Sequence, residues 1–198
     1  MPARPDLAAV ILAAGRSARM GVFKPLLPFG PNSVIERILS TVREAGVESV
    51  RVVVGWNADR LIPILEGHGT PWVRNDRFDE GMYVSIQAGV QSLPADVAAF
   101  FLLPGDMPLV QSATLTRLIA EWDRRPRGIL YPCHEGRRGH PPLIAGAYIA
   151  EILRETPPGG LRTLLARHAE EARNIEVADP GILVDLDTPE EYRQSLDR

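Results

Sequence analysis

The sequence has little cysteine, no long hydrophobic run and no excess of charge of one sign. Its single cysteine, Cys133, excludes an intramolecular disulfide and a cysteine-rich zinc site, and fits a reducing compartment, so we expect a cytoplasmic protein. The apolar run at residues 7–14 is far shorter than the roughly 20 residues of a membrane span, and it indicates a buried strand rather than a signal peptide. The formal net charge of −3 leaves no basic field to attract nucleic acid or an anionic membrane, so any phosphate binding has to be local.

The composition is that of an ordinary globular protein: 198 residues, 45% of them hydrophobic and 24% charged. We expect one domain over residues 1–198, with residues 1–6 flexible. Strands are predicted at 7–12, 50–54, 71–73, 98–103, 128–131, 174–177 and 182–186, and helices at 34–45, 57–66, 82–93, 114–122, 147–154, 161–168 and from 189 onward. Pro63 is expected to shorten or kink the second helix. This alternation predicts an α/β fold, a three-layer α/β/α sandwich with a Rossmann-like, mostly parallel mixed sheet.

Two helix starts carry a specific capping pattern. Ser33 is followed three residues later by Glu36, and Thr188 is followed by Pro189 and, three residues after itself, by Glu191. A hydroxyl and a carboxylate at this spacing satisfy each other's free backbone N–H groups at the first turn. The pattern therefore predicts helices that begin directly after Ser33 and Thr188.

The loop after the first strand combines small residues with cations. Backbone N–H groups of small residues can approach phosphate oxygens closely, and Arg16, Arg19 and Lys24 add positive charge. The loop is not a P-loop, because prolines follow the lysine and disfavour a helix there, and the dinucleotide-binding alternative is weak because the acidic residue at the right distance, Glu36, lies in a helix. The loop therefore predicts a cradle for a nucleoside triphosphate.

The motif Leu-Ala-Ala-Gly-x-Ser-x-Arg-Met-Gly-x-x-Lys-x-Leu-Leu-Pro occupies residues 12–28, and further motifs lie at residues 80–82, 105–108, 136–141 and 185–190. With these motifs the chain resembles the molybdenum cofactor nucleotidyltransferases, and more closely their cytidylyltransferase branch. The resemblance implies a nucleotide-diphospho-sugar transferase-like fold and transfer of CMP from CTP to the terminal phosphate of molybdopterin, with release of pyrophosphate. Related guanylyltransferases usually carry Leu-Ala-Gly-Gly in place of Leu-Ala-Ala-Gly, so the resemblance favours CTP over GTP.

Three alternatives stay open. The chain could be a guanylyltransferase that uses GTP with molybdopterin, or a cytidylyltransferase for another small phosphorylated metabolite. From a different class, it could be a non-catalytic nucleotide or cofactor binder that regulates a molybdoenzyme. The presence of both Lys24 and Asp106 argues against a non-catalytic binding protein, because such a protein has less need of a metal ion at the α-phosphate.

Carboxylates at two places could hold the Mg²⁺ that nucleotidyl transfer needs. Asp106 directly follows a buried strand in a rigid glycine- and proline-bearing turn, and its hard oxygens suit Mg²⁺. Asp185 or Asp187 is a second candidate ligand, and only one of them can face the site if they lie on a strand, because successive side chains point to opposite faces. The alternative for each is a carboxylate that caps a nearby helix.

The remaining candidates follow from the loop chemistry and from the resemblance. The nucleotide-binding candidates are Leu12, Ala13, Ala14, Gly15, Arg16, Ser17, Lys24, Gly81 and Ser85. Catalytic roles are expected for Arg19, Lys24 and Asp106, the first two neutralising the triphosphate and the departing pyrophosphate. The basic segment at residues 134–140 is expected to bind the acceptor through Arg137, Arg138 and His140, with a solvated basic loop as the alternative. An apo-molybdoenzyme or its chaperone is the implied protein partner.

Overall fold

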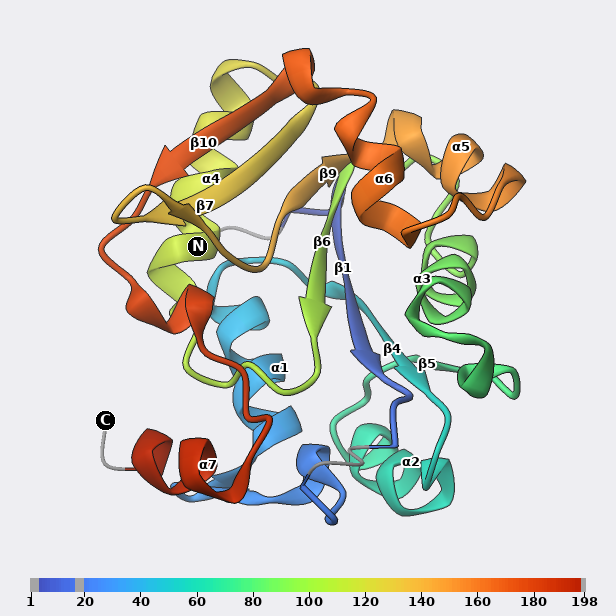
Figure 1. Ribbon diagram of the computed structural model, residues 1–198, viewed down its shortest axis with the longest axis vertical. Helices are drawn as coiled ribbons and strands as arrows, with labels where there is room; N and C mark the ends of the chain where they lie inside the picture. Colours follow the sequence, from blue (N-terminus) through green and yellow to red (C-terminus); the bar gives the residue numbers. More distant parts are fainter. Residues whose placement is uncertain (1–3, 17–19, 197–198) are drawn as a thin grey trace.

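A mixed β-sheet with helices on both faces forms the frame of the protein (Figure 1). The computed structural model describes residues 4–16 and 20–196. Among these residues the main sheet has eight strands, in the order β10-β7-β9-β6-β1-β4-β5 with β8 paired to β7, and β2 and β3 form a separate hairpin. The strands are β1 (Leu7–Ala13), β2 (Pro28–Phe29), β3 (Asn32–Ser33), β4 (Ser49–Val54), β5 (Trp72–Arg74), β6 (Ala99–Pro104), β7 (Ile129–His134), β8 (Arg137–Arg138), β9 (Leu143–Ala145) and β10 (Ala172–Glu176).

The centre of the sheet is parallel, as predicted. β1 pairs in parallel with β4 on one side and with β6 on the other, and nearly every side chain of these strands is buried. Strands covered on both faces read as continuous apolar runs, which is why the sequence reveals them. Antiparallel pairing is confined to β9, which lies between β6 and β7, and to β8. The carboxyl ends of β1, β4 and β6 therefore meet at one edge of the sheet, where ligands of such folds bind.

Helices cover the sheet in two groups. The α-helices are α1 (Val34–Glu44), α2 (Ala58–Gly67), α3 (Met82–Gln91), α4 (Ser112–Arg124), α5 (Ile149–Arg154), α6 (Gly160–Ala166) and α7 (Pro189–Leu196), and the 3-10 turns are η1 (Lys24–Leu26), η2 (Phe78–Glu80), η3 (Gly146–Tyr148), η4 (Ala169–Glu171) and η5 (Pro180–Leu183). α3 packs on β1 and β4 and contacts α5 and α6, whereas α4 packs on β7 and β10 and contacts α1. α2 continues through Pro63 to Gly67, so the proline does not shorten it. In the described part of the chain, no helix has both the length and the apolar character that a bilayer crossing requires.

Both predicted capping boxes are present. The Ser33 N–H donates to Glu36 Oε2 over 2.7 Å, and α1 begins at the next residue. At α7, the Thr188 N–H donates to Glu191 Oε2 over 2.8 Å, and the Glu191 N–H donates back to Thr188 Oγ1 over 3.2 Å. These contacts fix where α1 and α7 start. The capping residue of α7, Thr188, directly follows Asp187.

The strand predicted at residues 182–186 is wrong. The segment starts with η5, where Pro180 occupies the first turn and the Asp179 carboxylate accepts the Gly181 N–H over 2.9 Å. Proline supplies no N–H for a strand ladder, and the aspartate caps the turn instead. The rest of the segment is irregular, and Leu186 anchors it because its N–H donates to the Asp106 carbonyl over 3.0 Å.

The segment predicted as a loop at residues 134–140 contains a short hairpin. β8 pairs antiparallel with the end of β7, in register His134 opposite Arg137. The two connecting residues, Glu135 and Gly136, have φ values of 49° and 75°. Two successive positive φ values are typical of the type I′ turn that matches the strand twist, and Glu135-Gly136 does not indicate this turn in the sequence because asparagine or aspartate usually precedes the glycine.

Candidate active site

Lys24 lies buried at the edge of the sheet where β1 and β6 end. It is the first residue of η1, and Pro25 follows it in the same turn. The preceding residue, Phe23, is buried with its ring edge-on to Trp56 at 5.6 Å between centroids, which fixes the start of the turn. Only 7% of the Lys24 surface is exposed. A lysine this far from water needs partners for its ammonium group.

Two aspartates supply those partners. Lys24 Nζ donates to Asp106 Oδ2 over 2.9 Å and to Asp187 Oδ1 over 2.8 Å. The two carboxylates are more open than the lysine, with 25% and 29% of their side-chain surfaces exposed. Lys24, Asp106 and Asp187, here called the Lys24 triad, therefore place one buried positive charge between two partly exposed negative charges.

The backbone holds Asp106 and Asp187 in place. The Gly105 N–H donates to the Leu12 carbonyl over 2.9 Å, and a Cβ atom at Gly105 would lie 2.6 Å from that oxygen, so only glycine fits between β1 and Asp106. The bond from Leu186 to the Asp106 carbonyl then brings Asp187 alongside.

Asp185 does not join the triad. It is exposed, and no hydrogen bond or ion pair joins it to another described residue. It does lie near His140, where the charges of Asp106 and Asp185 oppose the desolvation that lowers the pKa of that histidine. The structure thus groups Asp187, and not Asp185, with Asp106.

The nucleotide-binding candidates at residues 12–15 lie where β1 ends: Leu12 and Ala13 are the last residues of the strand, and Ala14 and Gly15 follow it. Ala13 and Ala14 are buried, Leu12 is partly buried, and the Ala14 carbonyl accepts the Trp56 N–H over 3.1 Å. Gly15 is exposed, and a Cβ atom there would meet nothing within 4 Å. The predictions for Ser17 and Arg19 lie outside the described residues.

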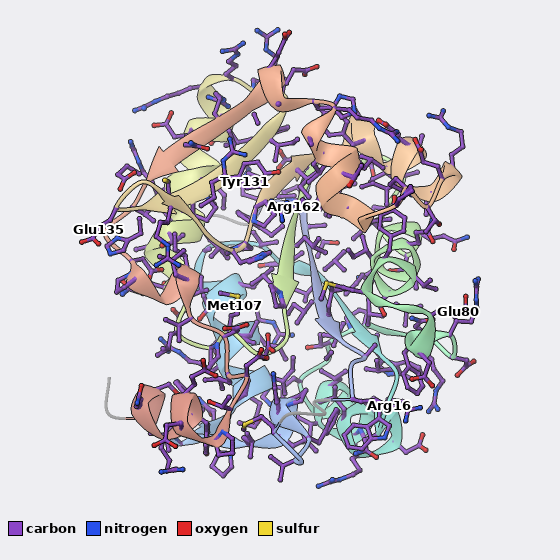
Figure 2. All side chains as sticks on the ribbon, viewed as in Figure 1. Arg16, Glu80, Met107, Tyr131, Glu135 and Arg162 are labelled. Atoms are coloured by element: carbon purple, nitrogen blue, oxygen red, sulfur yellow. The ribbon has the colours of Figure 1, made fainter. Side chains whose placement is uncertain are left out.

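Arg16 makes contacts that the sequence did not predict. Its guanidinium donates to both carboxylate oxygens of Asp79, over 2.7 and 2.6 Å, and it lies 5.6 Å from the centre of the Phe78 ring. Figure 2 shows Arg16 at the lower end of the sheet, where the carboxyl ends of β1 and β4 lie. Both partners are exposed, so the pair joins the loop to η2 without burying either charge.

Gly81 and Ser85 lie at the start of α3, in different environments. Gly81 precedes the helix with a φ of 109°, a conformation that side chains rarely adopt, and it is exposed. Ser85 is buried, and its hydroxyl accepts a hydrogen bond from Asn75 Nδ2 over 2.9 Å. Gly81 is therefore accessible to a ligand, whereas Ser85 is bonded to Asn75, the residue that directly follows β5.

Of the predicted acceptor residues, Arg137 and Arg138 form β8 against the end of β7, whereas His140 lies near Asp106 and Asp185. Arg138 is stacked over Tyr131, with 4.4 Å from its guanidinium carbon to the ring centre, and its Nε donates to Asn174 Oδ1 over 2.6 Å. Arg137 and His140 are exposed. Figure 2 labels Tyr131 beside β7, well above the carboxyl edge of the sheet. Tyr131 and Asn174 were missed, because strand alternation reveals neither the stacking nor the cross-strand pairing.

The chain is similar over most of its length to proteins of a known family. Residues 9–172 match the model of the MobA-like NTP transferase domain. The chain belongs to the MobA-like NTP transferase family. It is 23% identical over 190 residues to molybdenum cofactor cytidylyltransferase of Escherichia coli (strain K12), covering 96% of this chain and 95% of that protein.

Two solved structures share the fold of this MobA-like chain. A nucleotidyl transferase from Methanothermobacter thermautotroptrophicus superposes with a TM-score of 0.82 at 28% identity, covering 96% of each chain. Rv0371C from Mycobacterium tuberculosis H37Rv, solved in complex with manganese, gives a TM-score of 0.78 at 28% identity over 96% of this chain and 98% of that one. The protein is therefore a nucleotidyltransferase of this family, and such enzymes typically use a divalent metal ion.

The donor atoms of the Lys24 triad fit a hard divalent cation. Asp106 and Asp187 both reach the same lysine nitrogen, so their carboxylates are close neighbours, and both stay partly exposed. Among residues 4–16 and 20–196 no group of three or more His, Cys, Asp or Glu side chains could hold a metal. A cation such as Mg²⁺ binds one or two protein carboxylates and completes its shell with water and substrate phosphates, so two carboxylates are enough to hold such an ion.

Proposed function

We propose that this protein transfers CMP from CTP to the terminal phosphate of molybdopterin and releases pyrophosphate. The observation that carries the proposal is the Lys24 triad, a buried ammonium between two carboxylates at the carboxyl ends of β1 and β6. Transfer at an α-phosphate develops negative charge, which positive groups in a preorganised site stabilise. The Escherichia coli relative, named a molybdenum cofactor cytidylyltransferase, supports the choice of CTP and molybdopterin.

The loop after β1 would hold the triphosphate. Backbone groups of residues 12–15 provide close approach, and Lys24 provides the charge that neutralises the phosphates and the departing pyrophosphate. Arg19 would also neutralise the triphosphate and the departing pyrophosphate. Arg16 would add its charge next to the loop, and Gly81 would offer the start of α3 to the nucleotide.

Asp106 and Asp187 would hold Mg²⁺. The ion would supply charge stabilisation at the α-phosphate. The Gly105 turn and the Leu186 backbone bond hold the chain segments of the two carboxylates next to each other.

The acceptor phosphate would approach from the β7 half of the sheet. Arg137 and Arg138 would meet its charge, and His140 would donate a hydrogen bond or contact the ring system. A phosphate is already ionised at neutral pH, so the attack needs no general base. The rate then depends on orientation and charge stabilisation. The reaction would take place in the cytoplasm, with an apo-molybdoenzyme or its chaperone receiving the product.

Pyrophosphate release tests the proposal directly. The purified protein is mixed with Mg²⁺, molybdopterin bearing molybdenum, and CTP, GTP, ATP or UTP in turn. We expect release with CTP and little with the others, and an Asp106→Ala variant with an unchanged circular dichroism spectrum as the inactive control. Preference for GTP would make the protein a guanylyltransferase. No release with any nucleotide, from protein shown to bind CTP, would contradict the proposal and favour another acceptor or a binding role.

A further inference from the structure

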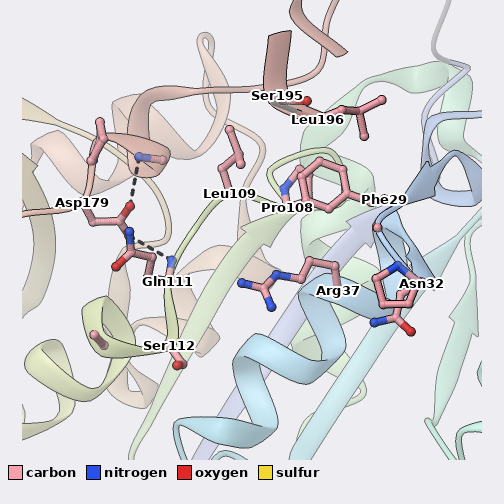
Figure 3. Close-up of a pocket in the computed structure, with 15 residues that line it drawn as sticks. Phe29, Asn32, Arg37, Pro108, Leu109, Gln111, Ser112, Asp179, Ser195 and Leu196 are labelled. Atoms are coloured by element: carbon pink, nitrogen blue, oxygen red, sulfur yellow. Dashed lines mark hydrogen bonds between the residues drawn. The ribbon is translucent and has the colours of Figure 1, made fainter. Parts of the chain in front are cut away.

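A cavity lies apart from the Lys24 triad, between α1, the β2–β3 hairpin, the start of α4 and α7 (Figure 3). Its volume is about 920 Å³, and no residue of the triad lines it. Cavities of about 300–1,000 Å³ accommodate small organic molecules. The cavity is thus large enough for a ligand of its own.

Arg37 provides the positive charge in this cavity. It comes from the first half of α1, and Figure 3 shows its side chain extending into the cavity. Its guanidinium has no hydrogen bond and no ion pair with any residue in the described ranges 4–16 and 20–196, although it is partly buried. A partly buried guanidinium with five donors and no partner is suited to a carboxylate or phosphate.

The carboxylate in the cavity wall cannot serve as that partner. Asp179 is 2% exposed, and it accepts three hydrogen bonds: from the Gln111 N–H over 2.9 Å, from Thr114 Oγ1 over 2.6 Å and from the Gly181 N–H over 2.9 Å. These hydrogen bonds link η5 to the start of α4. Asp179 keeps its negative charge, but no ion pair joins it to Arg37, and Arg37 is the cation among the described residues that line the cavity.

The rest of the wall is largely apolar. Phe29, Pro31, Pro108, Leu109 and Leu196 face the same space as Arg37. Flat and aliphatic side chains around one charged group favour a ligand that has a ring or an alkyl body and one anionic group.

We propose that this cavity is a second ligand site, for a small anion with an apolar ring, such as an aryl phosphate or an aromatic carboxylate. Arg37 binds the anionic group, and the ring packs between Phe29 and the prolines. The neutral amides and hydroxyl of Asn32, Gln111 and Ser112 lie in the same wall and offer further hydrogen bonds. This site goes beyond the transfer reaction and does not depend on it.

The position of the cavity connects it with the triad through the chain. The β2–β3 hairpin follows the turn of Lys24, Pro108 lies two residues after Asp106, and α7 begins two residues after Asp187. A ligand bound in the cavity would therefore contact the segments that directly follow Lys24, Asp106 and Asp187 in the sequence.

The test is a titration followed by amide NMR, with phenyl phosphate, inorganic phosphate and benzyl alcohol as probes. We expect phenyl phosphate to shift the amide signals of residues 29–32 and 109–113, and to bind at least tenfold more tightly than either fragment. Arg37→Gln should weaken binding of phenyl phosphate by roughly tenfold or more, because a charge-assisted hydrogen bond is lost, whereas Arg37→Lys should retain part of the affinity.

Arg127→Gln is the matched control, since Arg127 is an exposed arginine in the connection between α4 and β7, away from the cavity. Its affinity should equal that of the wild type, and thermal unfolding should show that all variants are folded. Signals that shift only at residues 13–16 and 105–107 would place the probe at the triad and overturn the proposal. Equal affinity in wild type and Arg37→Gln would overturn it as well.

Discussion

Replacing Lys24 by methionine tests the triad, because it removes the ammonium group and keeps a side chain of similar length. Breaking a fully buried ion pair costs about 3–5 kcal/mol. Here the lysine side chain is only 8% exposed, but its two partners are 25% and 29% exposed, so water can solvate the carboxylates left behind. We therefore expect a loss of about 2–3 kcal/mol in the free energy of unfolding, and a melting temperature about 4–12 °C lower for a chain of this size.

The assay is urea unfolding followed by tryptophan fluorescence, to which Trp56 contributes a local signal because its ring contacts Phe23. The matched control is Arg77→Met, which breaks the exposed ion pair of Arg77 with Glu80 and should change stability little, because exposed pairs are screened by water. Lys24→Met should also lower kcat/KM for the nucleotide by about a hundredfold or more, as the loss of one positioned donor typically does. A Lys24→Met protein as stable as the control and as active as the wild type would refute the reasoning.

Four further substitutions test other parts of the structure. Asp106→Ala should remove nearly all turnover and leave the fold intact, and turnover at the wild-type rate in Mg²⁺ would contradict its assignment to the metal. Gly89→Ala should destabilise by about 1–3 kcal/mol, since a Cβ atom would lie 2.4 Å from Val10 Cγ1. Gly67→Ala, in open space at the end of α2, should instead stabilise slightly, and chemical denaturation separates the two. The Ser33 and His68 hydrogen bonds lower the pKa of Glu36 from 4.5 to about 2, so this carboxylate stabilises the fold above pH 4.5 and loses that contribution as the pH falls toward 2. The stability difference between wild type and Glu36→Gln should therefore shrink over that range, and a constant difference would contradict the assignment.

The elements that could be predicted from the sequence are those whose pattern is local. β1, β4 and β6 are continuous buried runs, and the capping boxes at Ser33 and Thr188 set helix starts within a residue. The strand order was not predictable, because it depends on which runs pair and not on the runs themselves. The sequence does not reveal that β9 enters antiparallel between β6 and β7, since its three residues resemble any short apolar segment.

In the segment before α7 the strand prediction is wrong, but the apolar residue Leu186 still determines where Asp187 lies. Residues 182–186 do not form a strand, yet Leu186 is fully buried and its N–H is bonded to the Asp106 carbonyl. Fixing Leu186 in this way places Asp187 against Lys24 and leaves Asp185 exposed. Which of the two aspartates lies beside Lys24 is open from the sequence, because a tertiary hydrogen bond, and not strand alternation, decides that position.

The same reasoning explains why the triad itself could not be predicted. Lys24 is 82 residues from Asp106 and 163 from Asp187, and only the meeting of the loop after β1, the end of β6 and the segment before α7 brings them together. Two neighbouring carboxylates repel each other unless a positive charge lies between them. The buried ammonium supplies that charge within the chain, so the carboxylates are already positioned before any metal or nucleotide arrives. The site is therefore preorganised at the edge of the sheet where the phosphates of a nucleotide are expected to bind.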